Sequence, residues 1–201
     1  MKKRIFLALT LLMLFTASLA YAKTVRPEQL YGATVHASVG EYNVEEKTFT
    51  VTVYDYDVFH AEEVAELEVG DTILAGGWLY RITEIQDSDG TRIFACDGGE
   101  EIFFEKAPEE DGLIAVSTYD DRVFMNVVTV LHLPAAEDIV YEDHSDPEAN
   151  EMKTIKGLGA ILKAKGEKEE NSIGFHYYAT TVTLNDNLEI VKIHQDFDVA
   201  Q

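Results

Sequence analysis

The amino-acid sequence predicts a mainly β fold: an antiparallel barrel or sandwich meander with one substantial helix and a C-terminal β-hairpin. Two observations lead to this prediction. Turn signals rich in Gly and Asp recur at short spacing through the first two-thirds of the chain, and runs of β-branched and aromatic residues lie between them. Short strands separated by such turns are typical of barrels and sandwiches, and the added helix keeps an α+β class open.

The first 22 residues are predicted to be a signal peptide. A basic head at Lys2–Arg4 precedes an apolar run at Ile5–Phe15, and small residues follow up to Ala22. This is the order of a secretory signal, and the apolar run is shorter than the roughly 20 residues that a membrane span needs. We therefore expect an exported, extracellular protein without a membrane span, cleaved near Ala22.

The remaining chain, residues 23–201, is expected to form a single globular β-rich domain. It is long enough to bury a core without disulfides, and its only cysteine, Cys96, excludes an intramolecular one. Whether Cys96 pairs between chains stays open. A sub-boundary is conceivable at residues 142–151, with 152–201 as a helix plus hairpin.

The charge balance is strongly acidic. The chain has 37 acidic and 16 basic residues, a formal net charge of −21. Cleavage after Ala22 removes three basic residues and no acid, which takes the expected mature charge to −24. Such a surface repels nucleic acid, and it attracts cations and basic peptides.

The first expected strand, Thr48–Phe59, has an internal irregularity. Phe49, Val51 and Val53 share one face, but the large side chains that follow, Tyr54 and Tyr56, lie on the other. Because a strand has a side-chain period of two, either a bulge near residues 53–55 re-aims the chain, or the second half is covered on its other face.

A short helix is expected next, at Ala61–Leu67, and then a series of strands. The last strand of the series carries apolar residues on both faces, so it is expected to lie at the centre of the fold and to end at Pro134. The expected strands are Thr72–Leu74, Trp78–Ile85, Thr91–Cys96, Glu101–Phe104, Leu113–Thr118 and Arg122–Leu133.

The substantial helix is expected at about 146–165. Ser145 and Glu148 fit a capping box, and apolar residues then recur at spacings of three or four. Gly157 argues against a continuous helix and marks a plausible break. The hairpin is expected to follow, with arms at Ile173–Leu184 and Leu188–Val199.

The candidates for catalysis are Asp55, Asp57 and His132. Alternate carboxylates on one strand face would act as an acid/base pair or bind a cation, and a histidine buried in an apolar strand would serve as a general base. The simpler interpretation of these residues is a solvated strand face and a structural histidine.

Candidates for ligand binding are Tyr54, Tyr56 and Trp78, since aromatic rings at a barrel mouth stack on sugars or peptides. An aromatic core layer would explain the same residues. A calcium site is the only cofactor with any support. Asp87 and Asp89 precede Gly90 as in half of a calcium loop, although a hairpin turn explains them equally well.

His60 with Glu63 is a further metal candidate, and His60 is equally suited to cap the short helix. No strong zinc motif and no assembled catalytic triad occurs in the sequence. The leading expectation is therefore a non-catalytic extracellular binding or structural module with a cation, basic peptide or saccharide as ligand. The alternatives are a secreted hydrolase that uses Asp and His groups in a barrel mouth, and a calcium-stabilised surface protein.

Overall fold

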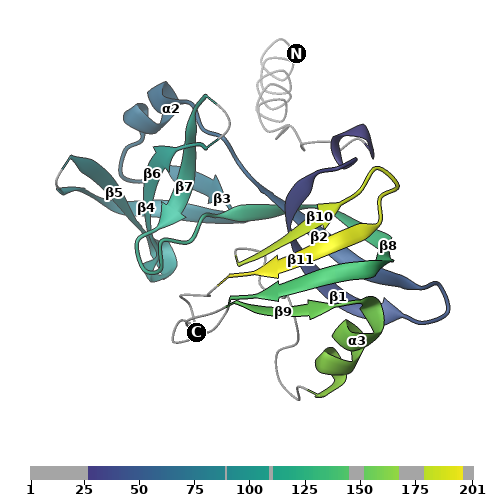
Figure 1. Ribbon diagram of the computed structural model, residues 1–201. Coiled ribbons are helices and arrows are strands. Elements are labelled where there is room, and N and C mark those ends of the chain that lie inside the picture. Colours follow the sequence, from purple (N-terminus) through teal and green to yellow (C-terminus); the bar gives the residue numbers. More distant parts are fainter. Residues whose placement is uncertain (1–26, 89, 109–110, 145–151, 168–178, 197–201) are drawn as a thin grey trace, which may run out of the picture.

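The computed structural model describes residues 27–88, 90–108, 111–144, 152–167 and 179–196 (Figure 1). It confirms the predicted β-rich class, because two sheets dominate these residues and one of the sheets closes nearly into a barrel. The predicted signal peptide, residues 1–22, lies outside the described part of the chain. A single 3₁₀ turn, η1 at Pro27–Gln29, leads into the first strand.

The barrel-like sheet has the order β11-β10-β1-β2-β8-β9, and β11 also pairs with β8. That extra pairing joins the two ends of the series β11-β10-β1-β2-β8 into a ring. All neighbouring strands in the sheet are antiparallel except β8 and β11, which are parallel. The strands are β1 (Thr34–Asn43), β2 (Thr48–Tyr56), β8 (Met125–Asp143), β9 (Lys153–Lys156), β10 (Thr180–Leu184) and β11 (Ile190–Gln195).

The five strands of the ring have the connectivity of an OB-fold barrel. Counted along the chain, they are arranged first, second, third, fifth and fourth, and the third and fifth are the parallel pair. The helix α3 (Leu158–Glu167) lies between the third and fourth strands in sequence. A five-stranded, nearly closed Greek-key barrel of this kind matches the OB architecture.

The second sheet is inserted between β2 and β8, in the connection between the second and third barrel strands. It is a simple antiparallel meander, β3-β4-β5-β6-β7, as the turn signals predicted. In Figure 1 this inserted sheet forms a separate lobe to the left of the barrel. Its elements are α2 (Ala61–Glu66), β3 (Thr72–Ala75), β4 (Trp78–Ser88), β5 (Thr91–Cys96), η2 (Asp97–Gly99), β6 (Glu101–Lys106) and β7 (Leu113–Ser117).

Each sheet has its own apolar core. The barrel core gathers inward side chains of all five ring strands, including Phe49, Val51, Tyr141 and Ile193, and Ile161 of α3 packs into it. One face of the inserted sheet packs around Phe94 and its neighbours. A smaller cluster on the other face joins the inserted sheet to the end of β2.

The strand buried on both faces is β7 and not β8. Four consecutive residues of β7, Ile114–Ser117, are buried, whereas Val127 and Val130 of β8 are 59% and 52% exposed. Nor does β8 end at Pro134. This residue is the last to pair with β2, and Ala135 is the first to pair with β11. Proline lacks the N–H that a ladder needs, so it suits the point where a strand changes partner.

The predicted helix at 146–165 is wrong over residues 152–157, and its first residues, 146–151, lie outside the described part of the chain. Residues 153–156 form β9, which pairs with the second half of β8, and α3 begins only at Leu158. The chain turns from strand to helix at Gly157, whose φ of +86° is open to glycine at little cost. The break considered at Gly157 is thus real, while the proposed capping box at Ser145–Glu148 lies outside the described residues.

Candidate functional site

Two exposed valines lie on the outer face of the barrel. Val127 pairs with Tyr54 and Val130 pairs with Thr52, both of which point away from the core. Val127 and Val130 are three residues apart on β8, and they share this face because the pairing register of β8 shifts by one residue between them. Val53 pairs with Thr129, but the next residue of β2, Tyr54, pairs with Val127. Val128 is therefore the extra residue of a β-bulge. The bulge lies on β8 and not within β2 at residues 53–55, where the sequence allowed for one; the other predicted alternative fits, because Tyr56 at the end of β2 is covered by an apolar cluster.

The rest of this outer face is polar. The Tyr54 hydroxyl lies 3.2 Å from Ser38 Oγ on β1. His132 is exposed, contrary to the buried strand expected for it, and it pairs with Thr50, whose Oγ1 lies 3.5 Å from His132 Nδ1. We call the side chains of Tyr54, Thr52, Val127, Val130 and His132 the barrel face. It presents two apolar groups between hydrogen-bonding groups.

The candidate carboxylates Asp55 and Asp57 lie at the end of the barrel beside Asn126. Asn126 pairs with Asp55 across the β2–β8 ladder, and its side-chain amide donates a hydrogen bond to Asp57 Oδ2. Asp55 Oδ1 accepts a hydrogen bond of 2.9 Å from the Tyr56 backbone N–H. His132 pairs with Thr50, which is five residues from Asp55, or about 17 Å along a strand. The structure therefore brings the two aspartates to one asparagine and keeps His132 away from them.

The turn that precedes Trp78 also comes close to Asn126. Trp78 follows the two-residue turn Gly76-Gly77 of the β3–β4 hairpin, in which both glycines have positive φ, as this tight turn requires. A Cβ on Gly76 would lie 3.3 Å from the Phe124 ring, and one on Gly77 would lie 3.6 Å from Asn126 Oδ1. The turn thus packs on the residues that lead into β8, and the Trp78 side chain remains 71% exposed.

Tyr56, the other aromatic candidate, packs against apolar side chains. It packs in the small apolar cluster with Val58, Ile114 and Val116, between the end of β2 and the inserted sheet. This packing matches the aromatic-core alternative for Tyr56.

The metal candidates are spread over the inserted sheet. His60 precedes α2 at its N-cap position, but its side chain makes no capping hydrogen bond, and Glu63 is exposed in the first turn. Asp87 pairs with Arg92 across the β4–β5 hairpin, and Asp89 lies outside the described residues. Among the residues that the structure describes, no group of three or more His, Cys, Asp or Glu is arranged to hold a metal ion.

A polar cleft on the inserted sheet was not predicted from the sequence. It has a volume of about 430 Å³ and lies between the η2 turn and the segment that follows β7. Its residues come from two turns about 17 positions apart in sequence, and only the pairing of β6 with β7 brings them together. The side chains that line it are Glu100, Glu101, Ser117, Thr118, Tyr119 and Arg122.

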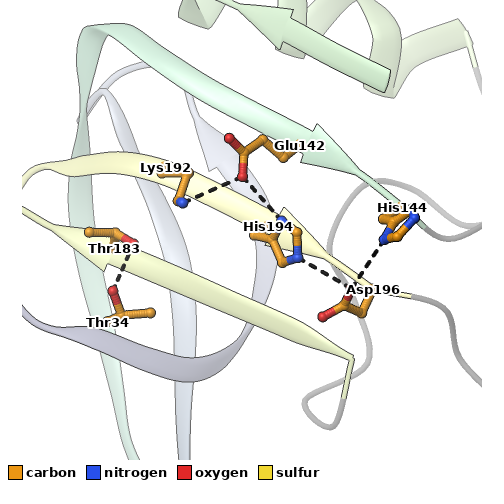
Figure 2. A network of polar contacts seen from close by, with 7 residues as sticks. All are labelled: Thr34, Glu142, His144, Thr183, Lys192, His194 and Asp196. Carbon is orange, nitrogen blue, oxygen red and sulfur yellow. Dashed lines mark hydrogen bonds and ion pairs between the residues drawn. The ribbon is translucent and has the colours of Figure 1, made fainter. Parts of the chain in front are cut away.

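A second polar cluster, also not predicted, lies where β8 and β11 close the barrel (Figure 2). Glu142 Oε2 contacts Lys192 Nζ at 3.4 Å and His194 Nδ1 at 3.1 Å. Asp196 Oδ1 contacts His194 Nε2 at 3.3 Å and His144 Nδ1 at 3.6 Å. Figure 2 shows the chain of contacts running across the parallel strand pair. We call these five residues the closure network.

A buried hydrogen bond lies on the core side of the same strand pair. The Tyr141 hydroxyl donates to Gln195 Oε1 at 2.8 Å, and both residues are buried. Burial, with a smaller effect of Asp143, raises the pKa of Tyr141 well above its usual value. The phenol therefore stays protonated and continues to donate at alkaline pH.

No known protein supplies an identity for this arrangement. The chain matches no protein-family model, and comparison with curated proteins and with solved structures found no similar protein. Within the described ranges, no helix is both long and apolar enough to span a bilayer. The geometry of this chain is therefore the only guide to its function.

Proposed function

We propose that this chain is an exported, non-catalytic binding module, and that it binds its ligand on the barrel face. One observation carries the proposal. Val127 and Val130 expose more than half of their surface on β8, the third strand of an OB-type barrel, where they pair with Tyr54 and Thr52 of β2, the second strand. Those two strands form the surface on which OB barrels hold extended ligands. The fold alone does not imply a function, so the ligand must be inferred from the chemistry of the barrel face.

The chemistry of the barrel face suits a peptide. Two neighbouring exposed valines offer an apolar contact, and Tyr54, Thr52 and His132 beside them offer hydrogen bonds. Apolar anchors with a polar rim are the usual composition of a protein-binding surface.

The net charge indicates what kind of peptide would bind. At −21, or −24 after the predicted cleavage, the chain repels the phosphates that many OB barrels bind and attracts basic segments. The proposed ligand is therefore an extended peptide in which basic residues alternate with apolar ones.

The hydrolase alternative gains no support from the placement of its residues. Asp55 and Asp57 lie around Asn126, and His132 is about 17 Å along the strand from Asp55. A general base and an acid that act on one bond need to lie within hydrogen-bonding reach of the same substrate group.

The proposal is tested with a fluorescent peptide of alternating Lys and Leu. The mature chain, residues 23–201, is titrated into this peptide, into a matched peptide of alternating Glu and Leu, and into single-stranded DNA, with anisotropy as the readout. We expect binding of the Lys-Leu peptide only. The double variant Val127→Ser/Val130→Ser should weaken this binding at least about tenfold, because the proposal makes these valines the central anchors, and the few anchors at the centre of an interface cost about 1 kcal/mol or more each when truncated.

The control variant is Val69→Ser, since Val69 is 60% exposed but lies in the inserted segment before β3. It should bind the peptide as well as the wild type does. If the double variant also binds like the wild type, attraction is merely electrostatic and the barrel face is not the site. Failure of the Lys-Leu peptide to bind the wild type would equally contradict the proposal.

A further inference from the structure

The polar cleft of the inserted sheet has walls that are held in place by internal hydrogen bonds. The buried Ser117 hydroxyl donates to Glu100 Oε1 at 2.6 Å, and the Thr118 hydroxyl donates to Glu101 Oε2 at 3.0 Å. A hydroxyl that donates to one oxygen of a carboxylate orients the group and leaves further lone pairs to accept hydrogen bonds. Two oriented acceptors therefore line one side of the cleft.

The cleft also contains a cationic donor, Arg122. Its Nε lies 3.5 Å from Asp120 Oδ2, and its guanidinium carbon lies 5.6 Å from the centre of the Phe124 ring. These contacts hold the planar group in one orientation where it lines the cleft. The cleft therefore places a positively charged group beside the two carboxylates.

An aromatic ring stands at the rim. Tyr119 lines the cleft and is 91% exposed, so its ring packs on little of the protein. Its backbone N–H contacts Ser117 Oγ at 3.4 Å, which ties the rim to the buried wall. An exposed ring beside a polar cleft offers a flat apolar face to a ligand that also needs hydrogen bonds.

The mixture of groups selects the ligand class. An anion would face Glu100 and Glu101, and a small cation would face the Arg122 guanidinium. A neutral polyhydroxy compound meets neither repulsion, and each of its hydroxyls both donates and accepts hydrogen bonds. The C–H face of a sugar ring can also stack on Tyr119. The volume of about 430 Å³ is within the range of small-ligand sites, about 300–1,000 Å³.

We propose that this cleft binds a neutral saccharide, with Tyr119 as the stacking platform and Glu101 as a hydrogen-bonding partner. The cleft lies on the inserted sheet, and none of its residues belongs to the barrel face. The proposed saccharide site is therefore independent of the proposed peptide site.

The test is an array of neutral, anionic and cationic oligosaccharides probed with the mature chain, followed by titration of one retained neutral glycan. The variants Tyr119→Ala and Glu101→Ala should each weaken glycan binding at least about tenfold without loss of folding, because both side chains are exposed. The controls Tyr31→Ala and Glu84→Ala change an exposed tyrosine and an exposed glutamate elsewhere, and they should leave binding unchanged.

Several outcomes would overturn the saccharide proposal. These are retention of no neutral glycan, equal binding by the Tyr119 variant and the wild type, or equal losses in the variants and their controls. If the Tyr119→Ala change instead abolishes binding of the Lys-Leu peptide, the cleft is a cation site. The Val127→Ser/Val130→Ser variant should keep full glycan binding, so this proposal and the barrel-face proposal can fail separately.

Discussion

A single inserted residue determines which side chains of β8 reach solvent. Because Val128 is bulged, Val127 and Val130 both face outward, while a regular strand would direct them to opposite faces. Val191 has the same role in β11: Thr183 pairs with Lys192 and Leu184 with Ile190, so Ile190 and Ile193 are both buried. A residue's face thus depends on local register as well as on its parity in the sequence.

Cys96 is a residue whose chemistry follows from its surroundings. Its side chain is 5% exposed, and its thiol donates a weak hydrogen bond to the Phe94 carbonyl. Burial, followed by the charges of Asp97 and Glu100, raises the pKa of Cys96 to about 11 from the ordinary 9.0. A thiol in this environment is a poor nucleophile and cannot meet a second chain without local opening.

We predict that the native thiol reacts slowly with a disulfide reagent at about pH 8. A pKa two units higher lowers the thiolate fraction about a hundredfold, so the native labelling rate should fall by at least that factor relative to the unfolded chain. The thiol of the unfolded chain loses its proton at a lower pH than the buried thiol does. The free energy of unfolding should therefore fall as pH rises from about 9 towards 11. The unfolded chain in concentrated guanidinium is the control, and equal rates in the two states would contradict the prediction.

At the scale of elements, α3 is positioned by the barrel more than by its own sequence. The Gly157 N–H donates to the Ile139 carbonyl of β8, and its carbonyl accepts from the N–H groups of Ala160 and Ile161. The helix therefore begins one residue after a glycine that is fastened to the barrel wall. Ile161, 1% exposed, packs in the barrel core, and Leu158 and Leu162 pack beside it.

We predict that Ile161→Ala lowers the free energy of unfolding by about 2–5 kcal/mol, because it leaves a cavity in a closed core. Urea denaturation followed by circular dichroism measures the loss. The matched control is Ala160→Gln, an exposed change in the same helix, which should stay within about 0.5 kcal/mol. A loss below about 1 kcal/mol for Ile161→Ala would mean that α3 does not seal the barrel.

At the scale of the whole molecule, β8 connects nearly every part of the fold. Its first half pairs with β2, and its second half lies between β11 and β9. The ring closes through the parallel pair β8–β11, which carries the closure network on its surface (Figure 2) and the Tyr141–Gln195 hydrogen bond in its core. Partly exposed ion pairs contribute only about 0–1 kcal/mol each, so the core packing of the pair matters more.

We predict that salt stabilises this protein. With 37 acidic and 16 basic residues, repulsion within the folded chain outweighs the few attractive pairs that salt also weakens. The urea midpoint should therefore rise between low ionic strength and about 0.3 M sodium chloride, where the Debye length falls below about 10 Å. Potassium chloride at the same concentration should have the same effect, and a falling midpoint, or a shift specific to one cation, would contradict general screening.

The sequence by itself predicted the β-rich class, the meander of the inserted sheet and the irregularity near Val53. These features depend on local chemistry: turn residues that accept positive φ, a side-chain period of two, and the break of that period. The strand Thr91–Cys96 was located to the residue for the same reason. The strand β1 was not predicted.

Only the tertiary structure decided how the strands close and which polar groups meet. The parallel pairing of β8 with β11 joins segments about 50 residues apart. Residues 153–156 form the strand β9 because they pair with the second half of β8. Likewise, the cleft of Glu101 and Tyr119 and the closure network of Glu142 and His194 exist only after distant strands have paired. Local sequence patterns do not predict such long-range contacts, because the energy of each contact depends on which distant segment of the chain lies alongside.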